Sequence, residues 1–136
     1  FLALTLVFIK ESVIVPLPHA EGPDACLHLM SLISMIDHDL AVVYLEYMPV
    51  FFKEILEDRG MTLVDVSKEE YDRLGSNVLA LAPGICLMLE GNPDIQNRLE
   101  ELGVKVHLYP GKELSIKGTG GPTCLTQPIF RTSAKQ

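Results

Sequence analysis

The sequence predicts an α/β fold, in one domain, built from repeated strand–strand–helix–strand (ββαβ) modules. The chain has 136 residues, the length of one ordinary domain, and 48% of them are hydrophobic, which is enough for a core. Short apolar runs alternate with two amphipathic segments of helical period. The stretches 58–64 and 101–107 are similar and lie 43 residues apart. This period indicates a repeat architecture, with sheets around a centre and helices outside.

The first part of the chain consists of apolar runs separated by polar segments. Residues 2–9 and 12–17 are predicted as short strands. The apolar runs 26–36 and 40–45 flank the polar triplet Asp37-His38-Asp39, which predicts a hairpin. A turn accounts for the Asp and His residues of this triplet without a metal ion.

A helix with one apolar face is predicted after the hairpin. Its apolar residues recur at helical spacing: Met48, Phe51, Phe52, Ile55 and Leu56. Pro49 in the first turn and Gly60 after the last turn are typical of the two ends of a helix. A strand is expected at 62–66. Ser67 and Glu70 then have the spacing of a capping box, which predicts a short second helix.

The next block repeats the order of the first. Strands are predicted at 77–82 and 85–89, and Asn92 is a predicted N-cap before a second amphipathic helix. The apolar face of that helix is expected to comprise Ile95, Leu99 and Leu102. A closing strand follows at 104–108. Residues 110–117 are interpreted as the start of a third unit that lacks its helix.

Composition restricts the partners of the chain. The net charge is −7 and the pI is near 5, so no basic surface is available to bind nucleic acid. The apolar residues 1–9 are too short to span a membrane and lack the features of a signal peptide, so they are interpreted as a buried strand that begins within a longer protein. The three cysteines show no CxxC spacing, and the four histidines have no zinc-ligand spacing. A cytoplasmic protein without a cofactor is predicted.

Residues 118–124 contain the first candidate for chemistry, since three glycines and a proline precede Cys124. Glycines permit a tight turn and a close approach, so the turn is expected to present the thiol of Cys124 to a pocket. His28 is the candidate acid/base partner, because a thiol site commonly pairs a cysteine and a histidine that are distant in sequence. Two alternatives stay open: Cys124 as a small buried hydrophobe and His28 as a hydrogen-bonded core histidine.

Three segments resemble one known group of enzymes. The segments 26–34 (CLHLMSLIS), 76–81 (SNVLAL) and 120–126 (GGPTCLT) are similar to the guanidino-group-modifying enzymes, which comprise arginine deiminases, amidinotransferases and dimethylarginine dimethylaminohydrolases. The resemblance extends from about residue 15 to about residue 131. These proteins are five-module α/β propellers of the pentein fold. The resemblance therefore implies a partial α/β propeller, with residues 1–136 as a single domain that forms the C-terminal half of a longer propeller.

The resemblance also implies a covalent mechanism on a small guanidino substrate. Cys124 would attack the guanidinium carbon of arginine or a methylated arginine, and His28 would protonate the departing amine. A thiouronium intermediate would then be hydrolysed to citrulline. Transfer of the amidino group to an amine, or an inactive propeller piece that binds a partner, are the alternatives. Because an incomplete propeller exposes strand edges, self-association into a homo-oligomer is also expected.

Two departures from the family pattern concern substrate binding. Met30 stands where deiminases carry an acidic residue, which favours the dimethylarginine hydrolase type. Glu21 and Asp24 resemble a Glu-Gly-Gly-Asp motif that in the family lies a whole module before the histidine, so each is predicted as a substrate carboxylate with a polar loop as the alternative. Asn77, in the second matching segment, is the third residue predicted to bind substrate.

Overall fold

The computed structural model describes residues 11–18, 22 and 28–130, and they form two modules of the same plan. The first contains β1 (Ile33–Met35), β2 (Leu40–Val43), α2 (Val50–Asp58) and β3 (Thr62–Asp65). The second contains β4 (Leu79–Ala82), β5 (Ile85–Leu89), α4 (Pro93–Glu101) and β6 (Lys105–Tyr109). Shorter helical elements are η1 (Leu29–Ser31), η2 (Leu45–Tyr47), α3 (Lys68–Tyr71), η3 (Lys112–Ile116) and α5 (Pro122–Leu125). The predicted strand–strand–helix–strand repeat is confirmed.

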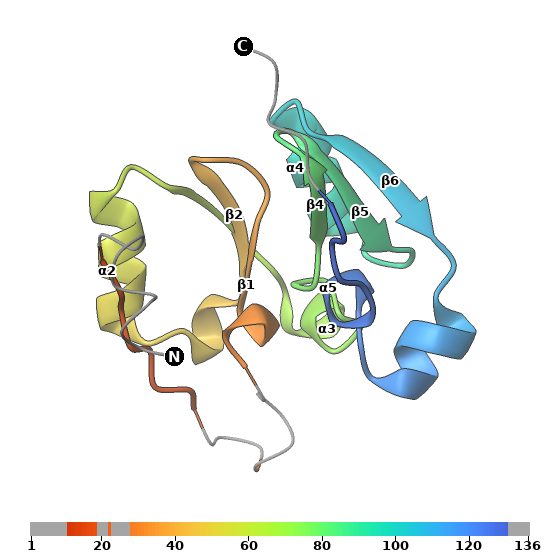
Figure 1. The fold of residues 1–136 in the computed structure, drawn as a ribbon, viewed down its shortest axis with the longest axis horizontal. Coiled ribbons are helices and arrows are strands. Elements are labelled where there is room, and N and C mark those ends of the chain that lie inside the picture. Colours follow the sequence, from red (N-terminus) through yellow and green to blue (C-terminus); the bar gives the residue numbers. More distant parts are fainter. Residues whose placement is uncertain (1–10, 19–21, 23–27, 131–136) are drawn as a thin grey trace.

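Each module is a three-stranded sheet with the same pairing. The first two strands form an antiparallel hairpin, and the third strand pairs in parallel with the second after the helix crosses over. The hairpin turn predicted at Asp37-His38-Asp39 is present, with the amides of Ile36 and Asp37 donating to the carbonyl of Leu40. The two modules stand side by side, and β1 lies against β4 between them (Figure 1).

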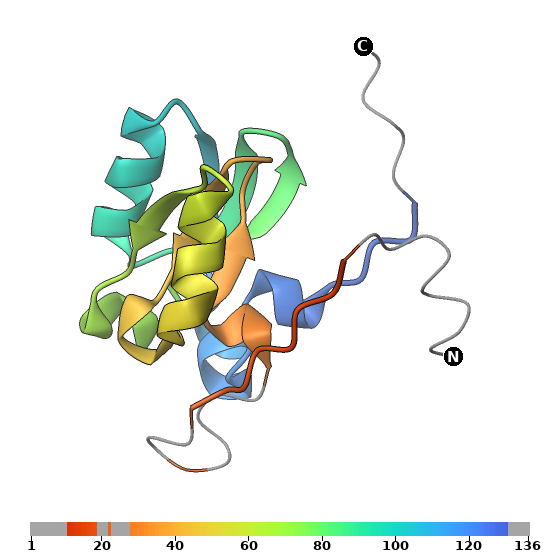
Figure 2. The same ribbon diagram turned by 90° about the vertical axis from the view of Figure 1, so that its left-hand side faces the viewer.

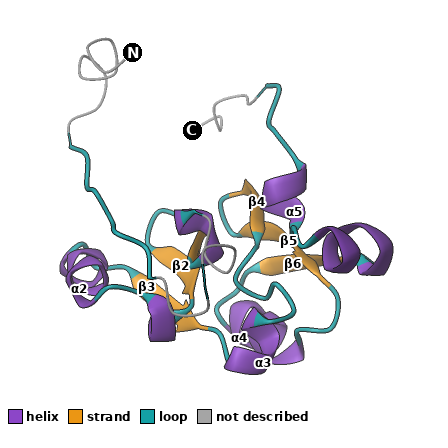
Figure 3. Cartoon of the chain, turned by 90° about the horizontal axis from the view of Figure 1, so that it is seen from below, coloured by secondary structure: helices purple, strands orange, loops and turns teal. Residues whose placement is uncertain are grey.

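Strand β2 is buried on both faces and joins two parts of the core. Alternate residues of a strand point to opposite faces. Leu40 and Val42 therefore contribute to the larger core cluster, which also contains Ile95 and Leu99 of α4. Ala41 and Val43 point to the opposite face and contribute to the smaller cluster beneath α2. The helix α2 thus covers one face of the first sheet, and the second module covers the other (Figure 3).

Several predicted element bounds are wrong. Residues 12–17 form no strand, and 2–9 lie outside the described residues. The apolar run 26–36, of which 26–27 also lie outside them, is not one strand, because 29–31 form the 3₁₀ turn η1 and only 33–35 pair in a ladder. At 77–82 the strand begins only at residue 79. Apolar composition alone does not distinguish a strand from an irregular or 3₁₀ segment, which accounts for these differences.

The apolar faces of both helices are narrower than predicted. Phe52 and Leu56 of α2 are buried, whereas Phe51 is 39% exposed. A nine-residue helix touches the sheet along one stripe, so a residue at the edge of that stripe stays in solvent. In the second helix Ile95 is buried, but Leu102 is 50% exposed because the helix ends at Glu101. Residues 112–116 form a single turn of π-helix.

The capping box at Ser67 is only half present, and its glutamate has another role. The Ser67 side chain accepts a hydrogen bond from the amide of Glu70, as predicted. The buried Glu70 carboxylate instead reaches the start of α4, where it accepts from the amides of Asp94 (2.9 Å) and Ile95 (3.1 Å). Asn92 occupies the predicted N-cap position but makes no capping bond with its side chain. Glu70 therefore caps α4 from a different element.

We predict that Glu70→Gln lowers the free energy of unfolding by about 2 kcal/mol, because it replaces one of two acceptors and removes a negative charge at a helix N-terminus. Urea unfolding followed by circular dichroism measures this loss. The control is Glu69→Gln, an exposed neighbour, with an expected change within about 0.5 kcal/mol. Equal stability of the two variants would show that the Glu70 cap contributes nothing.

In the part of the chain that the structure describes, no helix combines the length and the apolar character needed to cross a membrane.

Candidate active site

Cys124 lies in the short helix α5, so the prediction that it lies on a turn outside any helix is wrong. Pro122 occupies the first helical position, where its fixed φ suits a helix start, and the amide of Leu125 donates to the carbonyl of Gly121 (3.1 Å). Cys124 is an exposed residue. Cys86 differs from it, because burial in β5 raises the pKa of the Cys86 thiol to about 11. Of these two free cysteines, only Cys124 can meet a substrate.

The side chain of Asn77 connects the segment before β4 to α5. Its Oδ1 accepts a hydrogen bond from the amide of Thr123 (3.0 Å), and its Nδ2 donates to Sγ of Cys124 (3.0 Å). Gly121 is required for this approach, because a Cβ atom there would lie 2.5 Å from Cγ and Oδ1 of Asn77. The structure thus brings together two residues that the sequence placed in the site, Asn77 and Cys124.

His28 is the residue that precedes η1, and its exposed side chain makes no capping hydrogen bond. It is neither in a strand nor in the core, so the alternative of a buried core histidine is excluded. The helical turn η1, which follows His28, and α5, which carries Cys124, lie side by side in two perpendicular views (Figure 1, Figure 2). Within the described residues no hydrogen bond joins His28 to Cys124.

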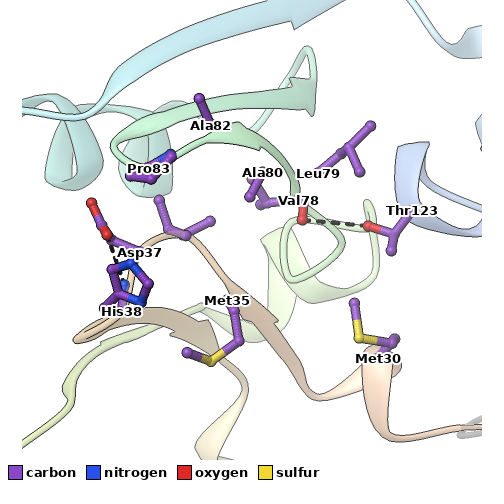
Figure 4. A pocket seen from close by; sticks show the side chains of 11 residues that line it. Met30, Met35, Asp37, His38, Val78, Leu79, Ala80, Ala82, Pro83 and Thr123 are labelled. Carbon is purple, nitrogen blue, oxygen red and sulfur yellow. Dashed lines mark hydrogen bonds between the residues drawn. The ribbon is translucent and has the colours of Figure 1, made fainter. Parts of the chain in front are cut away.

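A pocket of about 360 Å³ lies between the two hairpins. Figure 4 shows Met30 and Thr123 at one end of the pocket, and Asp37 and His38 at the other. The remaining lining is mostly apolar: Met35, Ile36, Val78, Leu79, Ala80, Ala82 and Pro83. His28 and Cys124 are close in sequence to Met30 and Thr123, respectively. The segments of both predicted catalytic residues therefore meet at the same end of the pocket.

The predicted substrate carboxylates cannot be placed in the same way. Glu21 and Asp24 lie outside the described residues. Met30, at the position of the family's acidic residue, lines the pocket with an apolar side chain. Asp37 also lines the pocket, and its Oδ1 accepts from the amide of His38 (2.7 Å) within the hairpin turn. Over the described ranges no group of three His, Cys, Asp or Glu side chains could hold a metal ion.

Two serines that the sequence did not single out connect the modules behind this site. Ser34 donates to the carbonyl of Ser76 (2.6 Å) and accepts from the amide of Val78 (3.1 Å). The hydroxyl of Ser76 donates to the carbonyl of Ser31 in η1 (2.9 Å). The paired residues are more than 40 positions apart, and serine has no spacing pattern that would have indicated the contacts.

Comparison with solved structures identifies the fold. ArgZ, an arginine dihydrolase from the ornithine-ammonia cycle in Cyanobacteria, matches with a TM-score of 0.65 and 19% identity over 79% of this chain and 17% of that chain. A mutant of DDAH from Pseudomonas aeruginosa, complexed with citrulline, matches with a TM-score of 0.59 and 20% identity over 75% of this chain and 36% of that chain. The modules therefore have the propeller-like pentein fold, although no closed propeller forms within the described residues.

Comparison with known sequences identifies the family. Arginine deiminase from Rhodococcus jostii is 30% identical over 87% of this chain, and arginine deiminase from Borreliella afzelii is 38% identical over 57% of it. The chain spans 35% of the length of the first relative, and the second alignment covers 19% of that relative. The family model for arginine deiminase matches residues 45–131, which include Asn77 and Cys124. This chain belongs to the arginine deiminase family, within the guanidino-group-modifying superfamily.

Proposed function

We propose that this chain carries the nucleophile and the acid/base residue of a hydrolase that acts on the guanidino group of arginine or a methylated arginine. The observation that supports this most directly is the meeting of two segments at one end of the pocket. One is η1, which follows His28 and contains the pocket residue Met30, and the other is α5, which contains Thr123 and the exposed residue Cys124. Neither His28 nor Cys124 lines the pocket itself, but each lies within two residues of a lining residue, so the proposal needs one nucleophile and one proton carrier to act at that end of the pocket.

The proposed reaction has two halves that together consume one water molecule. The Cys124 thiolate forms a C–S bond to the guanidinium carbon, and the terminal C–N bond breaks as His28 protonates the departing amine. His28 then removes a proton from water, which attacks the same carbon. The C–S bond breaks, and citrulline and the thiolate are released. A guanidine is a poor electrophile with a poor leaving group, so a strong nucleophile and a placed acid each address one difficulty.

The names of the structural relatives agree with this chemistry. A variant of the N-terminal domain of ArgZ is described as covalently bound to a reaction intermediate, and another structure of that domain as bound to its product. The DDAH structure contains citrulline. These descriptions apply to those proteins, which are at most 20% identical to this chain. A covalent intermediate in one relative and bound citrulline in another are both features of the reaction proposed for this chain.

The choice of substrate depends on the residues that hold the guanidinium. Glu21 and Asp24 are proposed as carboxylates for its positive charge, and the apolar Met30 at the pocket favours a methylated guanidine over arginine. The residue set of this chain thus differs from the deiminase pattern at Met30, even though the relatives named above by sequence are arginine deiminases.

The test is citrulline release from arginine and from asymmetric dimethylarginine, measured for the 136-residue chain and for the complete gene product. We expect citrulline together with ammonia or dimethylamine, and faster turnover of dimethylarginine. Amidino transfer would instead yield ornithine from arginine once an acceptor amine is added. If the complete gene product forms no citrulline, the proposed hydrolase function is wrong, and ornithine without citrulline would indicate amidino transfer.

The other predictions about the whole protein stay predictions. They are the division into one domain over 1–136, its place as the C-terminal half of a five-module propeller, the cytoplasmic location and the homo-oligomer.

A further inference from the structure

The side chain of Asn77 is engaged with α5 through both of its polar atoms. Oδ1 accepts a hydrogen bond from the amide of Thr123, and Nδ2 donates one to Sγ of Cys124, each at 3.0 Å. Asn77 is 4% exposed, whereas the sulfur that it contacts belongs to an exposed residue. The amide group therefore stands behind the thiol, on its protein side. A residue in this place can act on the sulfur more directly than on a substrate in the pocket.

The backbone around Asn77 is held on both sides by one buried side chain. Ser34 is fully buried, and its hydroxyl bonds the carbonyl of Ser76 and the amide of Val78. The amide of Asn77 itself donates to the carbonyl of Leu74 (3.0 Å). Three hydrogen bonds thus fix the main chain at this point. The Asn77 side chain therefore extends from a backbone held in one position, as a preorganised site requires.

We propose that Asn77 is a catalytic residue that stabilises the thiolate of Cys124 through its N–H···S hydrogen bond, and that Ser34 positions it. This role rests on the proposed function, in which Cys124 is the nucleophile, and it is separate from the substrate-binding role predicted from the sequence, which stays a prediction. A hydrogen bond to an ionised group is about twice as strong as one between neutral groups, so the donor favours the charged form. Asn77 is neutral and adds no charge that would repel a cationic substrate.

The experiment measures the rate at which iodoacetamide alkylates Cys124, with the modified peptide assigned by mass spectrometry. This neutral reagent reports the thiolate directly and needs no turnover. We expect Asn77→Leu to alkylate about tenfold more slowly at pH 7.5, the loss appropriate to one hydrogen bond to a charged group, with its rate profile moved to higher pH. Ser34→Ala is expected to give a smaller shift in the same direction.

The matched control is Asn92→Leu. Asn92 is 2% exposed, and its Nδ2 donates only to the backbone carbonyls of Leu89 and Arg73. This substitution removes a buried asparagine without touching the sulfur, so the Cys124 rate is expected to stay within about twofold of the parent rate. Cys86 serves as an internal gauge of folding, because its buried thiol reacts only when the chain opens.

The near-isosteric Asn77→Asp is the second variant, because it keeps the volume of the side chain and replaces the donor to Sγ by an acceptor. Slower alkylation is expected for it also. If Cys86 stays unreactive in both Asn77 variants and iodoacetamide still alkylates their Cys124 at the parent rate, the proposal is wrong. Citrulline assays separate the two claims. If the Asn77 variants slow the alkylation of Cys124 but the parent protein forms no citrulline, the proposed function is wrong, whereas the effect of Asn77 on the sulfur is still established.

Discussion

Cys124→Ser is expected to lower citrulline formation at least about a thousandfold, because removing the nucleophile of a covalent mechanism leaves only binding and electrostatic effects. Serine preserves the size of the side chain and can still accept the hydrogen bond from Asn77. Its hydroxyl is nevertheless almost entirely protonated near neutrality, and the guanidinium carbon is a poor electrophile. The loss should fall on kcat, while the apparent affinity for arginine changes little.

Three measurements isolate the chemistry of Cys124. Circular dichroism and urea unfolding should match those of the parent, because the Cys124 side chain is exposed. Cys86→Ala, in the core strand β5, should lose stability yet keep kcat within about threefold of the parent. Mass spectrometry of a rapidly quenched reaction should detect a substrate adduct on the parent alone. Full activity of Cys124→Ser would rule out covalent catalysis by this residue.

The elements that could be predicted from the sequence are those fixed by neighbouring residues. Apolar residues in succession at 40–45 identify a strand buried on both faces, and this is where β2 lies in the core. The spacing of Phe52 and Leu56 and of Ile95 and Leu99 identifies the two helix stripes. In each case the spacing of apolar residues over a few neighbouring positions determines which side chains are buried. A short stretch of sequence is therefore enough to predict the element.

The parts that could not be predicted depend on contacts between distant segments. Glu70 has the spacing of a capping-box residue, yet its carboxylate caps α4 by accepting from the amide of Asp94, 24 residues away, a contact that no local spacing indicates. Asn77 meets Cys124 across 47 positions, and the intervening module determines that approach. Cys124 itself lies in a helix because Pro122 starts one, whereas the glycines before it indicated a turn.

His28→Asn is expected to lower kcat for citrulline formation about 100- to 10,000-fold, the range typical of a lost general acid/base. Asparagine has a similar size and polarity but cannot carry a proton between the leaving amine and water. The dependence of kcat on pH should flatten with the substitution. The kcat of the variant should be measured with dimethylarginine and with arginine. The decrease in kcat should be larger for the substrate whose amine leaves less readily.

The control for His28 is His107→Asn, since His107 is an exposed residue of β6 and is not among the residues that line the pocket. Its kcat should equal that of the parent. In His28→Ala, added imidazole should restore part of the activity, because a small base can occupy the space beside η1 and exchange protons there. A structural role would give no such rescue. Unchanged kcat in His28→Asn would leave Cys124 without its proposed partner and would direct the search to Asp37 and His38, at the other end of the same pocket.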